Sequence, residues 1–256
     1  MPALRLTFVA SFASLALSAF GLAACGGAPS AEPEVLTPVD VVADVTAPPP
    51  CPFDLDAIRG SGVSVRYTLD GGPGEVRTEI SGGEGREVIV TWSERSVDGF
   101  DEGIERYLCT PAGLALIEVT TTEGGVAFAP PVLVLPGLSG EGAAAGTLAV
   151  HDDARSTVFD ARHAWTAADV APPVPAPTDA AGWRRVQSAL IIDVDGAEHA
   201  WMTETLWAID DDRLVVVRRE TTTRDADGES TRVEAADRIA EPSQSAGPPP
   251  LVIPGR

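Results

Sequence analysis

The chain of 256 residues contains no lysine and no asparagine, so all 18 of its basic residues are arginine. The absence of lysine excludes a Schiff-base lysine, a lysine general base and the lysine of a P-loop phosphate site. Both missing residues have A-rich codons, and we attribute their absence to a GC-rich genome rather than to function.

Positive charge is scarce in general. The 18 arginines stand against 38 acidic residues, which gives a formal net charge of −20. A surface of this kind repels phosphate backbones and anionic lipid headgroups. We therefore expect no nucleic-acid partner.

Cysteine is also rare, and the first of the three is the most informative. Leu22-Ala23-Ala24-Cys25 follows an uncharged apolar stretch that begins after Arg5. This pattern resembles the lipobox of bacterial prolipoproteins. The resemblance implies a signal peptide over residues 1–24, lipidation of Cys25 and a membrane anchor in the cell envelope, since two or more acyl chains hold a protein stably to a bilayer. An ordinary signal peptide or an uncleaved anchor is the alternative.

The residue after the lipobox cysteine bears on the membrane. Gly26 stands where an aspartate implies retention in the inner membrane of enterobacteria. In a Gram-negative cell this residue favours the outer membrane.

The two remaining cysteines are Cys51 and Cys109. An even pair in an exported chain favours a disulfide, which closes a loop of 58 residues here. Two reduced, buried thiols are the alternative.

Proline divides the chain. Residues 25–50 form a linker rich in Pro, Ala, Val and acids, and residues 241–256 form a second Pro-rich tail. The linker lacks a helical or strand period, and we expect both segments to be disordered and partly extended. In polyproline conformation the linker would reach roughly 75 Å, and as a random coil about 30 Å. Residues 51–240 remain as one domain, which is ample for a single core.

That domain is predicted to be all-β. Apolar and polar residues alternate with a period of two, and Asp-Gly or Gly-Gly pairs separate the runs, as in antiparallel hairpins. No stretch has a convincing helical period. The predicted fold is a β-meander that forms a single curved antiparallel sheet or half-barrel. Its strands are expected at residues 62–70, 75–81, 86–94, 104–109, 114–122, 146–151, 156–164, 184–194, 198–209, 213–223 and 230–236.

Catalytic and metal motifs are weak. The segment Gly137-Leu138-Ser139-Gly140 lacks the second glycine of a nucleophile elbow, and no His-Glu-x-x-His occurs. His151, Asp152, Asp153 and His163 could gather a metal across adjacent strands, but an acidic turn flanked by strand histidines explains them more simply. We expect no enzyme activity, no cofactor and no metal site.

One apolar segment stands out. Residues 126–138 read VAFAPPVLVLPGL, with three prolines and no charge, and the prolines argue against a central strand. The segment either packs in the core, forms the rim of an apolar pocket or contacts a partner. Trp201 and Trp207 are six residues apart and are predicted to share one face of a strand, where they line the same cavity or cover it.

A second resemblance rests on turns and prolines. The order YLC-TPAGL, TTTEGG and FAPPVLVLP, followed by LWAIDDDRLVVVRRETTTRDADG, is similar to uncharacterised β-meander lipoproteins grouped with TapB-like domains. It spans about residues 55–238, carries over no site residue, and implies a curved sheet like that of periplasmic lipoprotein carriers. Together these observations predict a membrane-anchored, non-enzymatic lipoprotein whose β domain binds an apolar ligand. The alternative is an accessory or scaffold lipoprotein that acts through protein–protein contacts.

Overall fold

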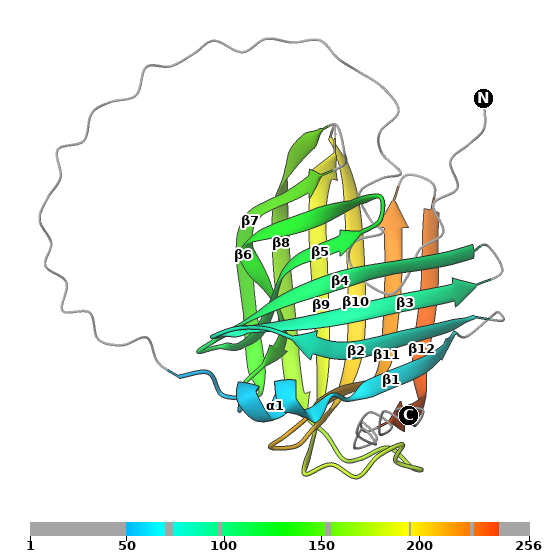
Figure 1. The fold of residues 1–256 in the computed structure, drawn as a ribbon. Coiled ribbons are helices and arrows are strands. Elements are labelled where there is room, and N and C mark those ends of the chain that lie inside the picture. Colours follow the sequence, from blue (N-terminus) through cyan, green and yellow to red (C-terminus); the bar gives the residue numbers. More distant parts are fainter. Residues whose placement is uncertain are drawn as a thin grey trace, which may run out of the picture.

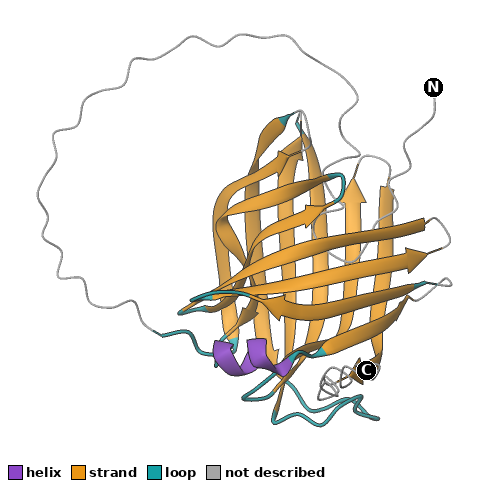
Figure 2. Cartoon of the chain, in the orientation of Figure 1, coloured by secondary structure: helices purple, strands orange, loops and turns teal. Residues whose placement is uncertain are grey.

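The computed structural model describes residues 50–69, 74–96, 99–151, 155–194, 196–225 and 228–240. The predicted signal sequence, Cys25, nearly all of the predicted linker and the C-terminal tail lie outside these ranges. Figure 1 shows the described chain as a β-meander closed into a barrel, and Figure 2 shows how little of it is helix or loop. No helix among the described residues is long and apolar enough to span a bilayer.

One short helix precedes twelve antiparallel strands in which each strand pairs with the next. The elements are α1 (Leu55–Ser61), β1 (Ser64–Leu69), β2 (Glu75–Gly82), β3 (Glu87–Ser96), β4 (Gly99–Thr110), β5 (Gly113–Thr121), β6 (Gly124–Pro136), β7 (Gly140–His151), β8 (Ser156–Asp169), β9 (Gly182–Val194), β10 (Ala197–Ile209), β11 (Leu214–Asp225) and β12 (Gly228–Ala240). The prediction of an all-β meander is confirmed.

The prediction of an open curved sheet or half-barrel is wrong, because the sheet closes. The first and last strands pair antiparallel, from Ser64 opposite Ala240 to Leu69 opposite Glu234, with a register shift between Arg66 and Tyr67. Closure removes the two edges that an open sheet would expose. Strands β1–β4 cross in front of β8–β12 at a steep angle (Figure 1), so the inner faces of the two groups of strands enclose the core.

The proline-rich apolar segment is a strand, contrary to the expectation from its prolines. Most of it belongs to β6, which pairs with β5 on both sides of the prolines and with β7 only before them, where Gly125–Ala129 lies opposite Thr147–His151. The register against β5 shifts between Leu116 and Glu118. Prolines 130 and 131 therefore occupy an irregularity where β6 turns away from β7, a position that tolerates their missing N–H groups.

Helix α1 was not predicted from the sequence. It spans only seven residues, too few for a visible period, and Asp54 caps its N-terminus by accepting a hydrogen bond from the Ala57 backbone N–H. Leu55 and Ile58 bury their side chains in the core at one end of the barrel. Just before the helix, Cys51 is bonded to Cys109 on β4, with Cα atoms 5.6 Å apart, as the predicted disulfide requires.

Candidate functional site

The inner face of the barrel is mostly apolar, and strand alternation decides which side chains reach it. On β10 the side chains of Trp201, Thr203, Thr205 and Trp207 are buried, whereas Met202 between them is exposed. The two tryptophans therefore share a face, as predicted. Trp207 lines an internal cavity of about 70 Å³ next to α1, together with Ile58 and Tyr107.

Charged side chains interrupt this apolar interior. Glu105 on β4 and Glu234 on β12 are almost completely buried, and Arg219 on β11 lies with its Nη1 atom 4.0 Å from the Glu234 carboxylate. The Tyr107 hydroxyl donates a hydrogen bond to Glu105. Burial raises the pKa of the Glu105 carboxyl despite the opposing charge of Arg219. Burial by itself would lower the pKa of Arg219, because it disfavours the charged guanidinium. The nearby carboxylates of Glu234 and Glu105 stabilise the charge and raise the pKa instead.

A second ion pair extends this group. Arg232 on β12 donates to buried Glu94 on β3 at 2.6 Å and to Glu234 at 2.9 Å. Arg232 thereby joins the two groups of strands that face each other across the barrel. Burial raises the pKa of Glu94, and its hydrogen bond with Arg232 opposes that rise. We name Glu94, Glu105, Arg219, Arg232 and Glu234 the inner charge cluster.

Four ring nitrogens on the inner face have no hydrogen-bond partner within the described part of the chain. They belong to Trp92, His163, Trp201 and Trp207. A buried polar group without a partner costs about 1–3 kcal/mol, and in native proteins water or a ligand usually satisfies it. Of the four side chains, Trp207 also lines the cavity beside α1.

The histidine in this set is expected to make stability depend on pH. Burial lowers the pKa of His163 to about 4, whereas an unfolded histidine titrates near 6.5. Because the unfolded chain then binds more protons, the contribution of His163 to stability falls as the pH falls from 6.5 to 4, by up to about 3 kcal/mol. As the pH falls from 6.5 to 4, the free energy of unfolding of His163→Phe should therefore rise relative to that of wild type by up to about 3 kcal/mol. Chemical denaturation at several pH values measures this difference. Parallel pH profiles would contradict the assignment.

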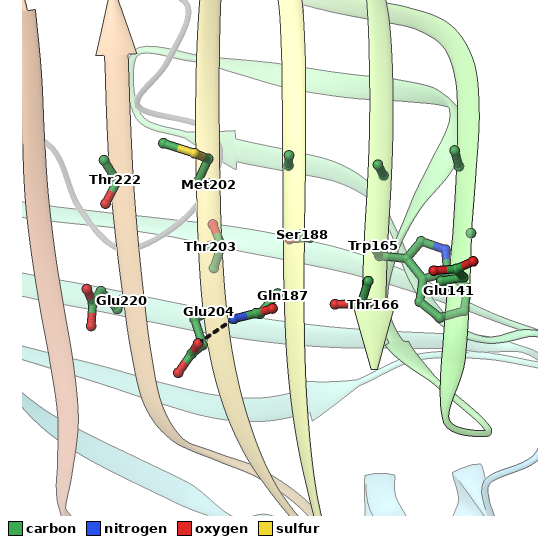
Figure 3. A pocket seen from close by; sticks show the side chains of 14 residues that line it. Glu141, Trp165, Thr166, Gln187, Ser188, Met202, Thr203, Glu204, Glu220 and Thr222 are labelled. Carbon is green, nitrogen blue, oxygen red and sulfur yellow. Dashed lines mark hydrogen bonds between the residues drawn. The ribbon is translucent and has the colours of Figure 1, made fainter. Parts of the chain in front are cut away.

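A larger depression lies on the outer face of β7–β11. This outer hollow is open to solvent and has a volume of about 820 Å³. Figure 3 shows it with the crossing strands behind. Two rows of outward side chains cross it at right angles to the strands: Glu141, Thr166, Gln187, Glu204 and Glu220, and beside them Ala143, Ala164, Ala189, Met202 and Thr222.

The two rows differ in chemistry. Three alanines make up most of the second row, so the floor there is close to the backbone of the sheet, and Met202 adds apolar surface. In the polar row Gln187 donates to Glu204 at 2.8 Å, and Arg218 pairs with Glu220 at 2.6 Å. Glu141, at the β7 end, has no ion pair or hydrogen bond among the described side chains that would balance its charge. The outer hollow therefore combines an apolar strip with an uncompensated carboxylate at one end.

The remaining sequence candidates that the structure describes do not assemble into a catalytic or metal site. Asp152 and Asp153 lie outside the described residues, and Cys25 does too. His151 ends β7 at the surface, and the Ser139 hydroxyl accepts a hydrogen bond from the Asp169 backbone N–H. Within the ranges that the structure describes, no three His, Cys, Asp or Glu side chains are grouped to hold a metal ion.

Comparison with known proteins found no relative: no family model, no curated protein and no solved structure matches the chain.

Neither the outer hollow nor the inner charge cluster was predicted from the sequence. For the cluster a signal was present, because Glu105 alternates with Tyr107 and Cys109, which places a carboxylate on a buried face. For the hollow the sequence carries no signal, since it arises from the curvature of five strands.

Proposed function

We propose that this chain is a membrane-anchored, non-enzymatic lipoprotein of the cell envelope that binds a partner protein through the outer hollow. The observation that carries this proposal is the size of the outer hollow. Ligand sites usually measure about 300–1,000 Å³. The outer hollow is about 820 Å³, whereas the cavity beside α1 is about 70 Å³.

The shape and chemistry of the hollow favour a protein segment over a small molecule. It is open and spans five strands, so an extended or helical segment can lie along it without entering the barrel. Its apolar strip suits small hydrophobic side chains, and Glu141 suits a basic one. The anchor at Cys25 and the linker of residues 25–50 would let the domain reach such a partner from the membrane.

Site-specific photocrosslinking in intact cells tests this proposal. With benzoylphenylalanine in place of Met202, we expect one protein-sized adduct, and the same probe in place of Arg77, on the outer face of β2, should give none. The additional substitution Ala189→Arg fills the centre of the hollow and should abolish the adduct. An adduct that is equal at both probe positions, or that persists with Ala189→Arg, would refute binding in the hollow.

A second candidate function is the binding of an apolar ligand that carries a polar head, on the inner face. The four unpartnered ring nitrogens favour it, because an acceptor from such a ligand would satisfy them. Native mass spectrometry of the purified full-length protein distinguishes the two. An adduct of lipid size that is lost on denaturation supports the inner site, and a clean protein mass speaks against it.

A further inference from the structure

The loop between β8 and β9 exposes an apolar surface at one end of the barrel. It covers residues 170–181, and from Val170 to Pro177 it reads Val-Ala-Pro-Pro-Val-Pro-Ala-Pro, without a charge. Val174 is 97% exposed. The other exposed residues of this stretch are Ala171, Pro172, Pro175, Ala176 and Pro177. A contiguous group of exposed apolar side chains marks a contact site more often than a single one does.

The turn between β6 and β7 adds to this surface. Leu138 in that turn is 80% exposed, and the hydroxyl of the next residue, Ser139, accepts a hydrogen bond of 3.1 Å from the backbone N–H of Asp169, where β8 ends. On the other side of Leu138, Gly137 packs so closely against exposed Pro52 that a Cβ atom on Gly137 would lie 2.7 Å from the Pro52 Cγ. We name Pro52, Leu138 and the exposed residues of the stretch 171–177 the apolar end patch.

The chain enters the domain beside this patch. The first described residues begin at position 50, and Cys51 is fixed to Cys109 by the disulfide. Figure 2 shows α1, which follows directly, and the β8–β9 loop at the same end of the barrel. An anchor at Cys25 therefore holds the barrel by the end that carries the apolar end patch.

The charges next to the patch restrict what it can contact. Glu141 follows Leu138 by three residues, Asp179 follows Pro177 by two, and both carboxylates are exposed. They repel anionic headgroups and phosphate groups on a partner, as does the formal net charge of −20. The patch therefore suits a surface that is apolar beneath groups without net charge, as in a bilayer of zwitterionic lipids.

We propose that the apolar end patch contacts the bilayer in which Cys25 is anchored, with zwitterionic lipid as its ligand. This inference depends on the lipid anchor of the proposed function. The side chains of Leu138 and Val174 enter the boundary between headgroups and acyl chains. The prolines of the loop have no N–H group, so fewer backbone donors lose their hydrogen bonds to water there.

The anchor allows a weak contact to be occupied. Two aliphatic side chains bind a bilayer weakly by themselves, since even a whole myristoyl chain holds a protein only marginally. The linker of residues 25–50, however, would reach only about 30 Å as a random coil. A tether of that length keeps the effective concentration of the patch at the bilayer in the millimolar range, so that the contact forms without high affinity.

The contact orients the barrel on the membrane. Val158, close to the start of β8, then lies roughly 36 Å along the strand from Asp169 and points away from the bilayer, at about 3.3 Å per residue. Glu141, at one end of the outer hollow, lies near the headgroups. The inference holds whatever the outer hollow binds.

Nitroxide labels on the full-length protein in phosphatidylcholine vesicles test this proposal. With Cys25 lipidated and the disulfide formed, Ala176→Cys provides the one free thiol. The matched control Val158→Cys places the same label at an exposed valine near the other end of β8. Power-saturation spectroscopy compares collisions with oxygen, which concentrates in the bilayer, and with a nickel chelate, which stays in water. We expect the ratio of oxygen to nickel collisions to be about three-fold higher at position 176 than at 158.

Two further variants separate the patch from exposed apolar side chains in general. Leu138→Glu/Val174→Glu should lower the ratio at position 176 to that at 158, because two carboxylates then face the bilayer. Phe100→Glu/Ile104→Glu changes two exposed apolar residues on β4 and should leave the ratio at 176 unchanged.

The outcomes distinguish this proposal from the anchor on which it depends. Equal ratios at positions 176 and 158, in protein whose Cys25 carries lipid, would overturn the membrane contact and leave the anchor intact. An intact mass without lipid on Cys25 would overturn both. A label at 176 that is shielded from oxygen and nickel alike, increasingly so with more protein per vesicle, would overturn the proposal in favour of contact with a second copy.

Discussion

Replacement of Arg219 by methionine is expected to lower the free energy of unfolding by about 3 kcal/mol. Glu105 and Glu234 are each less than 5% exposed, and Arg219 is the cation that faces both of them. Methionine has a similar length but no charge, so the packing is largely kept while Glu105 loses its counter-charge and Glu234 keeps only Arg232. Urea unfolding at pH 7, followed by tryptophan fluorescence, measures the loss.

A matched variant separates charge from packing. In Arg219→Met/Glu105→Gln/Glu234→Gln the uncompensated charges are gone, and we expect part of the lost stability to return.

The single variant Arg219→Met should also lose less stability at acid pH than at pH 7. Burial already raises the pKa of Glu105, and removal of Arg219 raises it further. A carboxyl whose pKa is higher in the folded state contributes stability below its unfolded pKa and loses it as the pH rises. A loss that is equal at pH 4 and pH 7 would show that packing, not charge, explains the effect.

The strands could be predicted from the sequence because alternation is a local property. Apolar residues at every second position identified eleven of the twelve strands, and the exception was β6, whose central prolines argued against it. Closure of the barrel is not local. It depends on the pairing of β1 with β12, which are separated by most of the chain. No residue on either strand indicates with which strand it pairs.

The functional surfaces were harder to predict because they depend on where the sheet bends. The outer hollow comes from the curvature of β7–β11, and residues 140–146 pair only with β8 because β6 leaves β7 at Pro130 and Pro131. The prolines were visible in the sequence, but not the neighbouring strand with which pairing would end at them. Small residues at 140–146 indicated a flexible connection as readily as an edge strand, so they carried no signal until the pairing was known.

The disulfide is the second feature with a large expected effect on stability. Cys51 and Cys109 are separated by 58 positions in the chain, and closing a loop of that length stabilises the fold by about 4 kcal/mol in the chain-entropy model. In the variant Cys51→Ala/Cys109→Ala we therefore expect a melting temperature lower by about 10 °C, measured by circular dichroism.

The structural setting of this disulfide adds a reason beyond chain entropy. Cys109 is fully buried on β4, and Cys51 joins α1, whose residues Leu55 and Ile58 cover one end of the core, to that strand. Without the bond, the first residues of the domain can detach while the strands stay paired. Reduced wild type should match the variant, because both lack only the cross-link. If oxidised wild type and the variant melt within about 2 °C of each other, the packing of α1 alone fixes the start of the domain, and the bond contributes little to stability.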